Sequence, residues 1–377
     1  MANRSDRRNV SELHSNSNEQ ASARPDYYNP FGRQERPAQE GAFDNPRQED
    51  GESKIMNVIR KTDFDDDGRI DDALQAGSRR RPRGSAQVDA TALRPDDDSV
   101  PVFKLEEMHT EFDPDDGIYW CYQQHSDHPS FTPGLLRDVR KIQDTLERRY
   151  GGASASQCPI KYLVWSSQRN DIFNLGGDLR LIARLIAEGD EKSLRRYAEA
   201  CIDICFPNYR RLGMPVITVA LVQGDALGGG FEAALSSDML IAERGANMGL
   251  PEILFNLFPG MGAFSFLGRK IGPGLAQKML LSGTIYTAEQ LHEMGVVDIL
   301  ANEGSGEEAL LDHVRKQGRQ HNAQRSIFKV RDRFAPLTRD ELIDITEIWV
   351  EAALNLTDSD LRRIDRLVRA QKRRLPA

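Results

Sequence analysis

The sequence predicts an α/β fold in which parallel strands alternate with helices. Three observations lead to this prediction. Short β-branched runs are typical of buried strands, the segments between them have helical spacing, and composition changes near residue 100. The last part of the chain contains helical patterns only, so we also expect a helical C-terminal region.

Residues 1–100 are predicted to form a disordered acidic and polar extension. They are rich in Ser, Asn, Gln, Gly and Pro and contain few aromatic residues, so they bury too little apolar surface to offset chain entropy. Within them Lys54–Arg60 has helical spacing. Asp63–Asp71 follows the order of a calcium-binding EF-hand loop, but Leu74 stands where a bidentate glutamate is expected, which favours a solvated acidic run.

The remaining chain is predicted to divide at residue 300. We expect a catalytic core over residues 101–300 and a helical region over residues 301–377 that completes the same domain. The core begins with a hairpin of Val102–Leu105 and Ile118–Gln123 around the turn sequence Asp113–Gly117. A helix over Thr132–Tyr150 follows, with Thr132 as N-cap and proline at its first position.

The other predicted elements follow in chain order. Strands are expected at Ile160–Trp165, Val216–Val222 and Met239–Ala242. Helices are expected at Leu179–Glu188, Glu191–Leu212, Ala263–Lys270, Leu275–Ser282, Ala288–Met294, Glu307–Phe328 and Arg339–Arg374, the last with a break near Thr357.

Composition argues against several classes of function. The net charge of −8 disfavours a nucleic-acid-binding surface, and no apolar run reaches the roughly 18 residues of a membrane span. The N-terminus lacks an apolar signal-peptide core, and the four cysteines show no disulfide or CxxC pattern, so a cytoplasmic protein is expected. Cys201 and Cys205 share a helix face as small core residues, and the pair His125 and His128 lies in a loop; no metal site is expected.

The segment Ala220–Glu252 carries the chemistry. A buried strand leads into Gly228-Gly229-Gly230, which lets the backbone approach a ligand closely, and a helix follows. Free N–H groups at a helix start can stabilise a developing oxyanion. Apolar surroundings raise the pKa of a carboxyl, so Glu232 and Glu252 could act as acid and base near neutral pH. This arrangement is typical of a catalytic site.

Three motifs in fixed order resemble those of the enoyl-CoA hydratase/isomerase (crotonase) superfamily. They are Phe173–Leu179 (FNLGGDL), Ala226–Glu232 (ALGGGFE) and Gly249–Glu252 (GLPE). The resemblance covers residues 101–377 and implies a crotonase-like ββα superhelix. Further segments resemble the RpfF-like branch, the diffusible signal factor (DSF) synthases, which keeps both glutamates; these segments are Pro129–Pro133, Phe255–Ala263 and Leu361–Gln371.

The resemblance implies roles for individual residues. The N–H groups of Gly177 and Gly229 would form an oxyanion hole, each donor stabilising an enolate-like oxygen by about 3–4 kcal/mol. Glu252 would take the C2 proton and Glu232 would protonate the leaving C3 hydroxyl, while Asp178 is structural. The remaining positions implied to contact substrate are Leu175, Gly176, Leu227, Gly228, Pro251 and Met261.

The resemblance also implies a function. The chain would dehydrate a medium-chain 3-hydroxyacyl thioester, carried by acyl carrier protein or coenzyme A, and hydrolyse the thioester. The product would be a cis-2-unsaturated fatty acid used in quorum sensing. No further cofactor is implied. The implied assembly is a homo-oligomer, a trimer or hexamer, and a membrane sensor kinase is an implied partner.

Alternatives remain open from the sequence alone. An enoyl-CoA hydratase of fatty acid metabolism would use the same glutamates, and a regulatory binding partner of a sensor kinase would need neither. Glu232 could be an ordinary first-turn helix residue, Pro251-Glu252 a helix start, and Gly176-Gly177 a simple turn. Apolar residues between 254 and 266 are expected in the core, with a subset lining an acyl tunnel.

Overall fold

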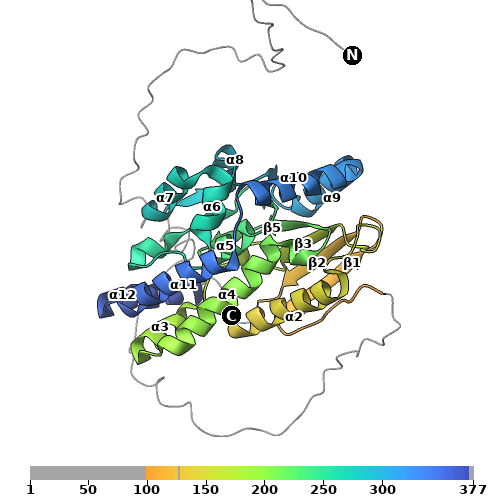
Figure 1. Cartoon of the computed structure of the whole chain (residues 1–377). Helices are drawn as coiled ribbons and strands as arrows, with labels where there is room; N and C mark the ends of the chain where they lie inside the picture. The colour runs from red at the N-terminus through yellow and green to blue at the C-terminus, as the bar shows by residue number, and fades with distance from the viewer. Residues whose placement is uncertain (1–98, 126–127, 373–377) are drawn as a thin grey trace, which may run out of the picture. The chain divides into compact units, whose positions relative to one another are not determined.

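The computed structural model describes residues 99–125 and 128–372, which contain two sheets, covering helices and a helical C-terminal region (Figure 1). This confirms the α/β fold class predicted from the sequence. The expectations for residues 1–98, including the EF-hand-like run and the helical segment near residue 57, fall outside the described residues.

The larger sheet has six strands in the order β1-β2-β3-β5-β7-β10. Only β1 and β2 pair in antiparallel fashion, and the others are parallel. The strands are β1 (Met108–Asp113), β2 (Ile118–Gln123), β3 (Tyr162–Ser167), β5 (Ile217–Val222), β7 (Met239–Glu243) and β10 (Ile299–Ala301).

A smaller sheet of short strands lies at the ends of these strands, in the order β4-β6-β8-β9. Its members are β4 (Ile172–Asn174), β6 (Asp225–Leu227), β8 (Asn247–Gly249) and β9 (Ile285–Thr287). Each of β3, β5 and β7 is followed at once by a strand of the smaller sheet and then by helical chain. This repeated ββα unit is the superhelix that the sequence resemblance implied.

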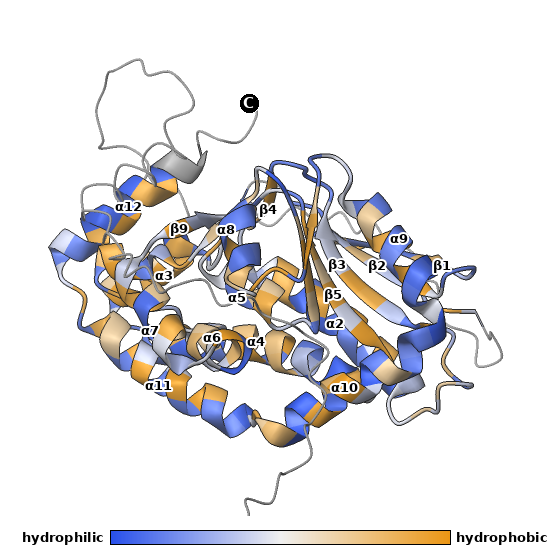
Figure 2. Cartoon of the chain, turned by 90° about the horizontal axis from the view of Figure 1, so that it is seen from above, coloured by the Kyte–Doolittle hydropathy of each residue, from blue (hydrophilic) through white to orange (hydrophobic). Residues whose placement is uncertain are grey.

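Both faces of the larger sheet are buried, which explains the unbroken apolar character of its central strands (Figure 2). Along β5, Ala220 and Val222 join the main core, whereas Val219 and Leu221 join a second core on the opposite face. Leu310 and Val314 belong to that second core, so residues 306–317 cover one face, whereas Trp349 and Ile364 from the last two helices join the main core on the other face.

The helices have boundaries close to those expected, and Thr132 caps α2 by accepting the N–H of Leu135 at 2.9 Å. The α-helices are α2 (Pro133–Tyr150), α3 (Leu179–Glu188), α4 (Glu191–Tyr209), α5 (Gly229–Leu235), α6 (Ala263–Ile271), α7 (Pro273–Ser282), α8 (Ala288–Glu293), α9 (Gly306–Gln317), α10 (His321–Phe334), α11 (Arg339–Leu354) and α12 (Asp358–Lys372). Short 3-10 helices are η1 (Arg211–Gly213), η2 (Pro251–Phe255) and η3 (Gly318–Gln320).

Two predicted elements are wrong in detail. The hairpin partner of β2 is Met108–Asp113 and not Val102–Leu105, because a short turn joins strands that directly flank it. Residues 102–105 contribute only a bridge, from Lys104 to His109. The helix expected over Glu307–Phe328 is two helices separated by η3, which begins at Gly318. The expected break near Thr357 is confirmed.

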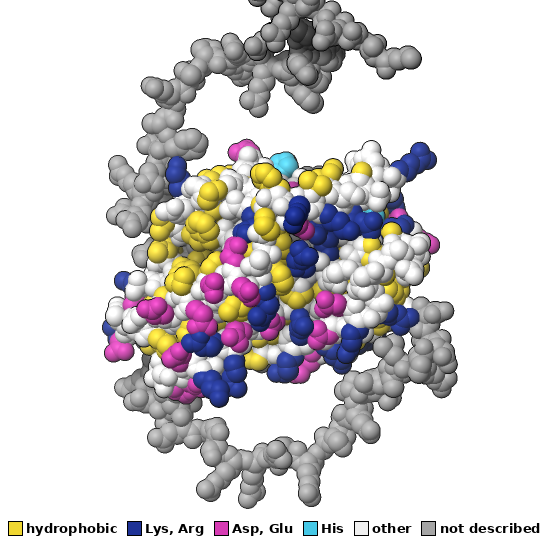
Figure 3. Space-filling model, viewed as in Figure 1, with side chains coloured by type: hydrophobic (Ala, Val, Ile, Leu, Met, Phe, Trp, Pro, Cys, Tyr) yellow, Lys and Arg dark blue, Asp and Glu magenta, His cyan; other side chains and the backbone are white. Residues whose placement is uncertain are grey.

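Helix α11 packs along α4 and is tied to it by ion pairs. Arg195 pairs with Glu347, and Arg339 pairs with Asp203 at 2.8 Å. Acidic and basic side chains are interspersed over the lower half of the face in Figure 3.

Among the described residues, no helix has the length and apolar character that crossing a bilayer requires.

Candidate active site

All ten residues singled out from the sequence lie on the wall of one cavity of about 100 Å³. They come from segments far apart in the chain, namely the loop after β4, the turn into α5, helix η2 and the loop after η2. The ten are Leu175, Gly176, Gly177, Leu227, Gly228, Gly229, Glu232, Pro251, Glu252 and Met261. Their placement together is a structural result; the role of each stays a prediction.

The two glycine turns approach each other too closely for any side chain to fit between them. A Cβ atom at Gly176, whose φ is +97°, would lie 2.8 Å from the oxygen of Leu227 and 3.0 Å from the nitrogen of Gly229. A Cβ atom at Gly229 would lie 3.4 Å from the nitrogen of Gly177. The N–H groups of Gly177 and Gly229 are therefore neighbours at the cavity wall.

These two N–H groups are available to a ligand. Gly229 is the first residue of α5, and the first N–H groups of a helix have no acceptor within it. Among the described residues, no hydrogen-bond acceptor is found for the N–H of Gly229 or of Gly177. Two adjacent free donors, one of them at a helix start, can stabilise an oxygen that gains negative charge.

Glu232 lies in the first turn of α5 and is 1% exposed. Its Oε1 accepts two backbone hydrogen bonds, from the N–H of Met261 at 2.7 Å and from the N–H of Ala263 at 2.9 Å. Burial raises the pKa of Glu232 from 4.5 to about 7, although the two N–H donors oppose this shift. Both donors belong to the segment 255–263 that resembles the DSF synthases.

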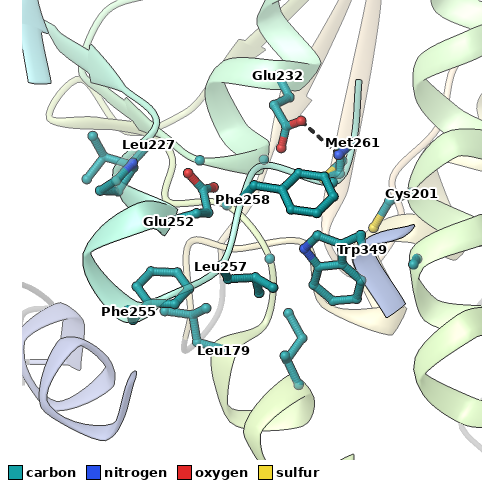
Figure 4. Close-up of a pocket in the computed structure, with 18 of the residues that line it drawn as sticks. Leu179, Cys201, Leu227, Glu232, Glu252, Phe255, Leu257, Phe258, Met261 and Trp349 are labelled. Atoms are coloured by element: carbon teal, nitrogen blue, oxygen red, sulfur yellow. Dashed lines mark hydrogen bonds between the residues drawn. The ribbon is translucent and has the colours of Figure 1, made fainter. Parts of the chain in front are cut away.

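Glu252 lies in η2, and its carboxylate points into the same cavity as that of Glu232 (Figure 4). The residue as a whole is half-buried because it faces the cavity, yet its Oε2 is out of contact with solvent and has no partner among the described residues. Burial, and then the charge of Glu232, raise the pKa of Glu252 well above 4.5.

Together these shifts give the pair a definite protonation state. Glu232 ionises first, because only Glu232 accepts two backbone N–H groups from the loop after η2. Its charge then holds the proton on Glu252. Above the pKa of Glu232, the pair therefore contains one carboxylate and one carboxylic acid side by side, which is the arrangement that paired acid and base catalysis needs.

Apolar side chains form most of the remaining wall, and several come from helices that the sequence analysis did not connect to the site. The remaining lining residues are Leu179, Ile182, Tyr197, Ala198, Cys201, Phe255, Leu257, Phe258, Gly260, Trp349, Ile364 and Leu367. Among the apolar residues between 254 and 266, Phe255, Leu257 and Phe258 line the cavity, whereas Phe264 is 42% exposed.

Trp349 of α11 closes one side of the cavity (Figure 4). A Cβ atom at Gly260 would lie 2.6 Å from the indole ring, so the ring packs directly on the backbone there. The amphipathic spacing of residues 339–354 could have indicated that Trp349 faces inward. Nothing in that spacing indicates that it meets the loop after η2.

The other polar candidates have structural environments. Cys201 and Cys205 are each 1% exposed, which confirms them as buried residues. The Nε2 of His125 lies 3.0 Å from the carbonyl oxygen of Phe173, and burial lowers its pKa to about 4. Asp178 caps α3 by accepting the N–H of Leu181 at 3.1 Å, the structural position that the resemblance implied.

The match to a protein-family model agrees with the family that the three motifs resemble. The model of the enoyl-CoA hydratase/isomerase family matches residues 160–351, about half of the chain, including both glycine turns and both glutamates. The chain belongs to the enoyl-CoA hydratase/isomerase family.

Curated members of this family match over limited segments. A 2,3-dehydroadipyl-CoA hydratase of Escherichia coli is 46% identical over 79 residues, 21% of this chain and 31% of the relative. A mitochondrial methylglutaconyl-CoA hydratase of Rattus norvegicus is 28% identical over 45% of this chain and 49% of its own length. The chain thus spans less than half of these relatives.

Solved structures of the family share the fold over most of the described residues. DspI of Pseudomonas aeruginosa has 25% identity and a TM-score of 0.53, covering 67% of this chain and 97% of DspI. An enoyl-CoA hydratase of Bacillus halodurans has 20% identity and a TM-score of 0.57, covering 69% of this chain and 99% of that structure. At 20% identity the second likeness shows the fold alone.

Proposed function

We propose that this protein dehydrates a medium-chain 3-hydroxyacyl thioester and then hydrolyses the thioester, releasing a 2-unsaturated fatty acid of the DSF type. The observation that carries the proposal is the convergence on one apolar cavity of the buried Glu232, the half-buried Glu252 and two backbone N–H groups that have no acceptor among the described residues. The resemblance to the DSF synthases supports the finer assignment, because the segment Phe255–Ala263 supplies both donors to Glu232.

The first step removes water. The thioester oxygen accepts the N–H groups of Gly177 and Gly229, which makes the C2 proton acidic by stabilising the enolate-like oxygen. Glu252, as carboxylate, takes that proton, and Glu232, as carboxylic acid, protonates the C3 hydroxyl, which leaves as water. The products are a 2-enoyl thioester and one water molecule, and the pair still holds one proton.

The second step consumes water. A water molecule whose proton passes to a carboxylate of the pair attacks the thioester carbonyl, and the tetrahedral oxyanion is stabilised by the same two N–H groups. The C–S bond then breaks, and the thiol of the carrier leaves with a proton. The carrier is acyl carrier protein or coenzyme A, and the free 2-enoic acid is the product.

The test is product analysis by mass spectrometry. Purified protein incubated with 3-hydroxydodecanoyl thioester is expected to release free dodecenoic acid, and the Glu232→Gln, Glu252→Gln double variant is expected to release none. Turnover that leaves every thioester intact would reject the hydrolysis step. Absence of any turnover with hydroxyacyl and enoyl thioesters would reject the enzymatic proposal.

A second candidate is an enoyl-CoA hydratase of fatty acid metabolism. The pKa shifts of the pair favour it, because an ionised Glu232 can activate water while a protonated Glu252 delivers the C2 proton. Dehydration as proposed above starts instead with the proton on Glu232 and the charge on Glu252. Faster turnover of trans-2-enoyl-CoA, with the thioester left intact, would identify this activity.

The pH dependence of activity follows from the protonation of the two glutamates. It is the same for dehydration and for hydration, because each reaction needs one proton shared between the two carboxyl groups. Below about pH 7 Glu232 is protonated, the pair holds two protons and no base remains. We expect kcat/KM to fall about tenfold per pH unit below this value. A profile measured from pH 5 to 9 checks this, and activity that stays constant down to pH 5 would contradict the raised pKa.

We also propose a homo-oligomer, and a sensor kinase remains a proposed partner. In support of self-association, α10 exposes three apolar side chains, with Ile327 64%, Val330 67% and Phe334 90% exposed. Surfaces of this kind are commonly buried between subunits.

If the double glutamine variant retained the full signalling phenotype in cells, a binding role would replace the catalytic one.

A further inference from the structure

The backbone around Gly177 is held by a set of hydrogen bonds that leaves one N–H group unused. The N–H of Gly176 donates to Oδ1 of Asn174 at 2.8 Å, and the N–H of Asp178 donates to the hydroxyl of Tyr197 at 2.8 Å. Between these two satisfied donors lies the N–H of Gly177, for which no acceptor is found among the described residues. Of three consecutive N–H groups, the first and third are therefore bound to side chains, and the middle one has no acceptor among the described residues.

The direction of the middle N–H is fixed by the peptide unit that contains it. The carbonyl of Gly176 accepts the N–H of Phe131 at 2.8 Å. Because a trans peptide is planar, the N–H of Gly177 points opposite to that carbonyl. Holding the carbonyl against Phe131 therefore aims the N–H of Gly177 away from Phe131, on the side where the cavity lies.

Tyr197 of α4 connects the two chain segments of this arrangement, one at Phe131 and the other at Asp178. Its hydroxyl donates to the carbonyl of Phe131 at 2.8 Å while it accepts the N–H of Asp178. A Cβ atom at Gly177 would lie 3.5 Å from the Tyr197 oxygen, so the hydroxyl is directly beside the donor residue. One hydroxyl group thereby sets the position of Phe131 relative to Asp178.

Asn174, the last residue of β4, holds the other side. It is fully buried, and its Nδ2 donates to Oε1 of Gln123 at 2.8 Å, which fixes the amide plane. The Asn174 Oδ1 then presents a fixed acceptor to Gly176. Since a buried polar network with every member satisfied is rigid, the position of Gly176 is determined before any substrate binds.

We propose that Tyr197 and Asn174 are positioning residues for the oxyanion donor of Gly177. Neither needs to touch the reacting atoms through its polar group, because both act by fixing the peptide that carries the donor. The inference rests on the proposed function, in which the thioester oxygen accepts this N–H. A preorganised donor lowers the barrier only if its orientation does not relax when charge develops.

Tyr197→Phe tests the proposal, with Tyr119→Phe as the matched control. Tyr119 is likewise a buried tyrosine with two hydrogen bonds, to the carbonyl of Pro101 at 2.6 Å and to Oγ1 of Thr110 at 3.0 Å, but it does not line the cavity. Both variants remove one buried hydroxyl and keep the ring. A merely structural role predicts the same kinetics for both.

We expect Tyr197→Phe to lower kcat by about tenfold to a hundredfold with KM changed less than about threefold, because the lost interaction strengthens in the transition state. Tyr119→Phe should keep kcat within about twofold. Equal kinetics for the two variants would overturn the inference. Asn174→Ala should reproduce the kcat loss, and if it fails to fold, Tyr197→Phe alone decides.

A spectroscopic measurement separates this inference from the proposed function. A dimethylaminocinnamoyl thioester absorbs at longer wavelength when its carbonyl oxygen is polarised by hydrogen bonds. Wild-type protein should bind it with a red shift, and Tyr197→Phe should bind it with a smaller shift at similar affinity. No shift with the wild type would overturn the proposed function and the inference with it. A full shift with both proteins would overturn the inference alone.

Discussion

Glu232→Gln is expected to lower kcat by about a thousandfold without destabilising the fold. Both backbone hydrogen bonds to this side chain, from Met261 and Ala263, go to the same oxygen, Oε1. A glutamine can present its amide oxygen to both donors and so keep the packing. What it loses is the group that exchanges a proton with the C3 hydroxyl or with water. The measurement is kcat with the preferred thioester, together with Tm.

Glu243→Gln is the matched control. Glu243 is 2% exposed and also accepts two backbone N–H groups, but at different oxygens, from Gly306 at Oε1 and Gly304 at Oε2. Its replacement removes the acceptor of one of these two N–H groups, which costs about 1 kcal/mol of stability. Its kcat should match the wild type. The opposite pattern, with Glu243→Gln inactive and Glu232→Gln active, would disprove the catalytic assignment.

Gly228→Ala is expected to lower kcat/KM at least a hundredfold. Gly228 has φ +52° and ψ −128°, and a Cβ atom there would collide with Oε1 of Glu252. The glutamate can move aside only by leaving its position opposite Glu232. The backbone strain adds about 1–3 kcal/mol of destabilisation. Steady-state kinetics and chemical denaturation of the variant check both effects.

Gly274→Ala provides the comparison. Gly274 lies in the first turn of α7, and a Cβ atom there meets nothing within 4 Å. This variant should keep full activity and gain about 0.5 kcal/mol of stability, because alanine has less freedom in the unfolded chain. If Gly228→Ala behaved in the same way, the carboxylate of Glu252 would not need the place it occupies in this structure.

Sequence patterns predicted the long elements well because their signals are local. The continuous apolar character of β5 and the Thr132-Pro133 start of α2 depend only on neighbouring residues. The three-residue strands β4, β6 and β8 escaped prediction, since no period can be read from so short a run. They form part of the glycine motifs, so the residues were noticed for their chemistry and not for their pairing.

The polar part of the site and the apolar residues within the motifs could be predicted, but the apolar side chains contributed by distant helices could not. Glu232 and Glu252 stand near glycines in a recognisable order, and the structure places both on one cavity. The contact between Trp349 and Gly260 joins residues 89 positions apart, and no local pattern encodes such a pairing. The hydroxyl of Tyr197 was missed for the same reason, because its partners Phe131 and Asp178 belong to other segments.

The cavity wall extends beyond the residues that the family model matches. The family match ends at residue 351, yet Ile364 and Leu367 of α12 line the cavity together with the glutamates. The residues assigned to acid and base chemistry thus lie inside the matched region, whereas part of the apolar wall around them is supplied by a helix outside it. A change confined to α12 would therefore reshape the cavity without altering either glutamate or either glycine turn.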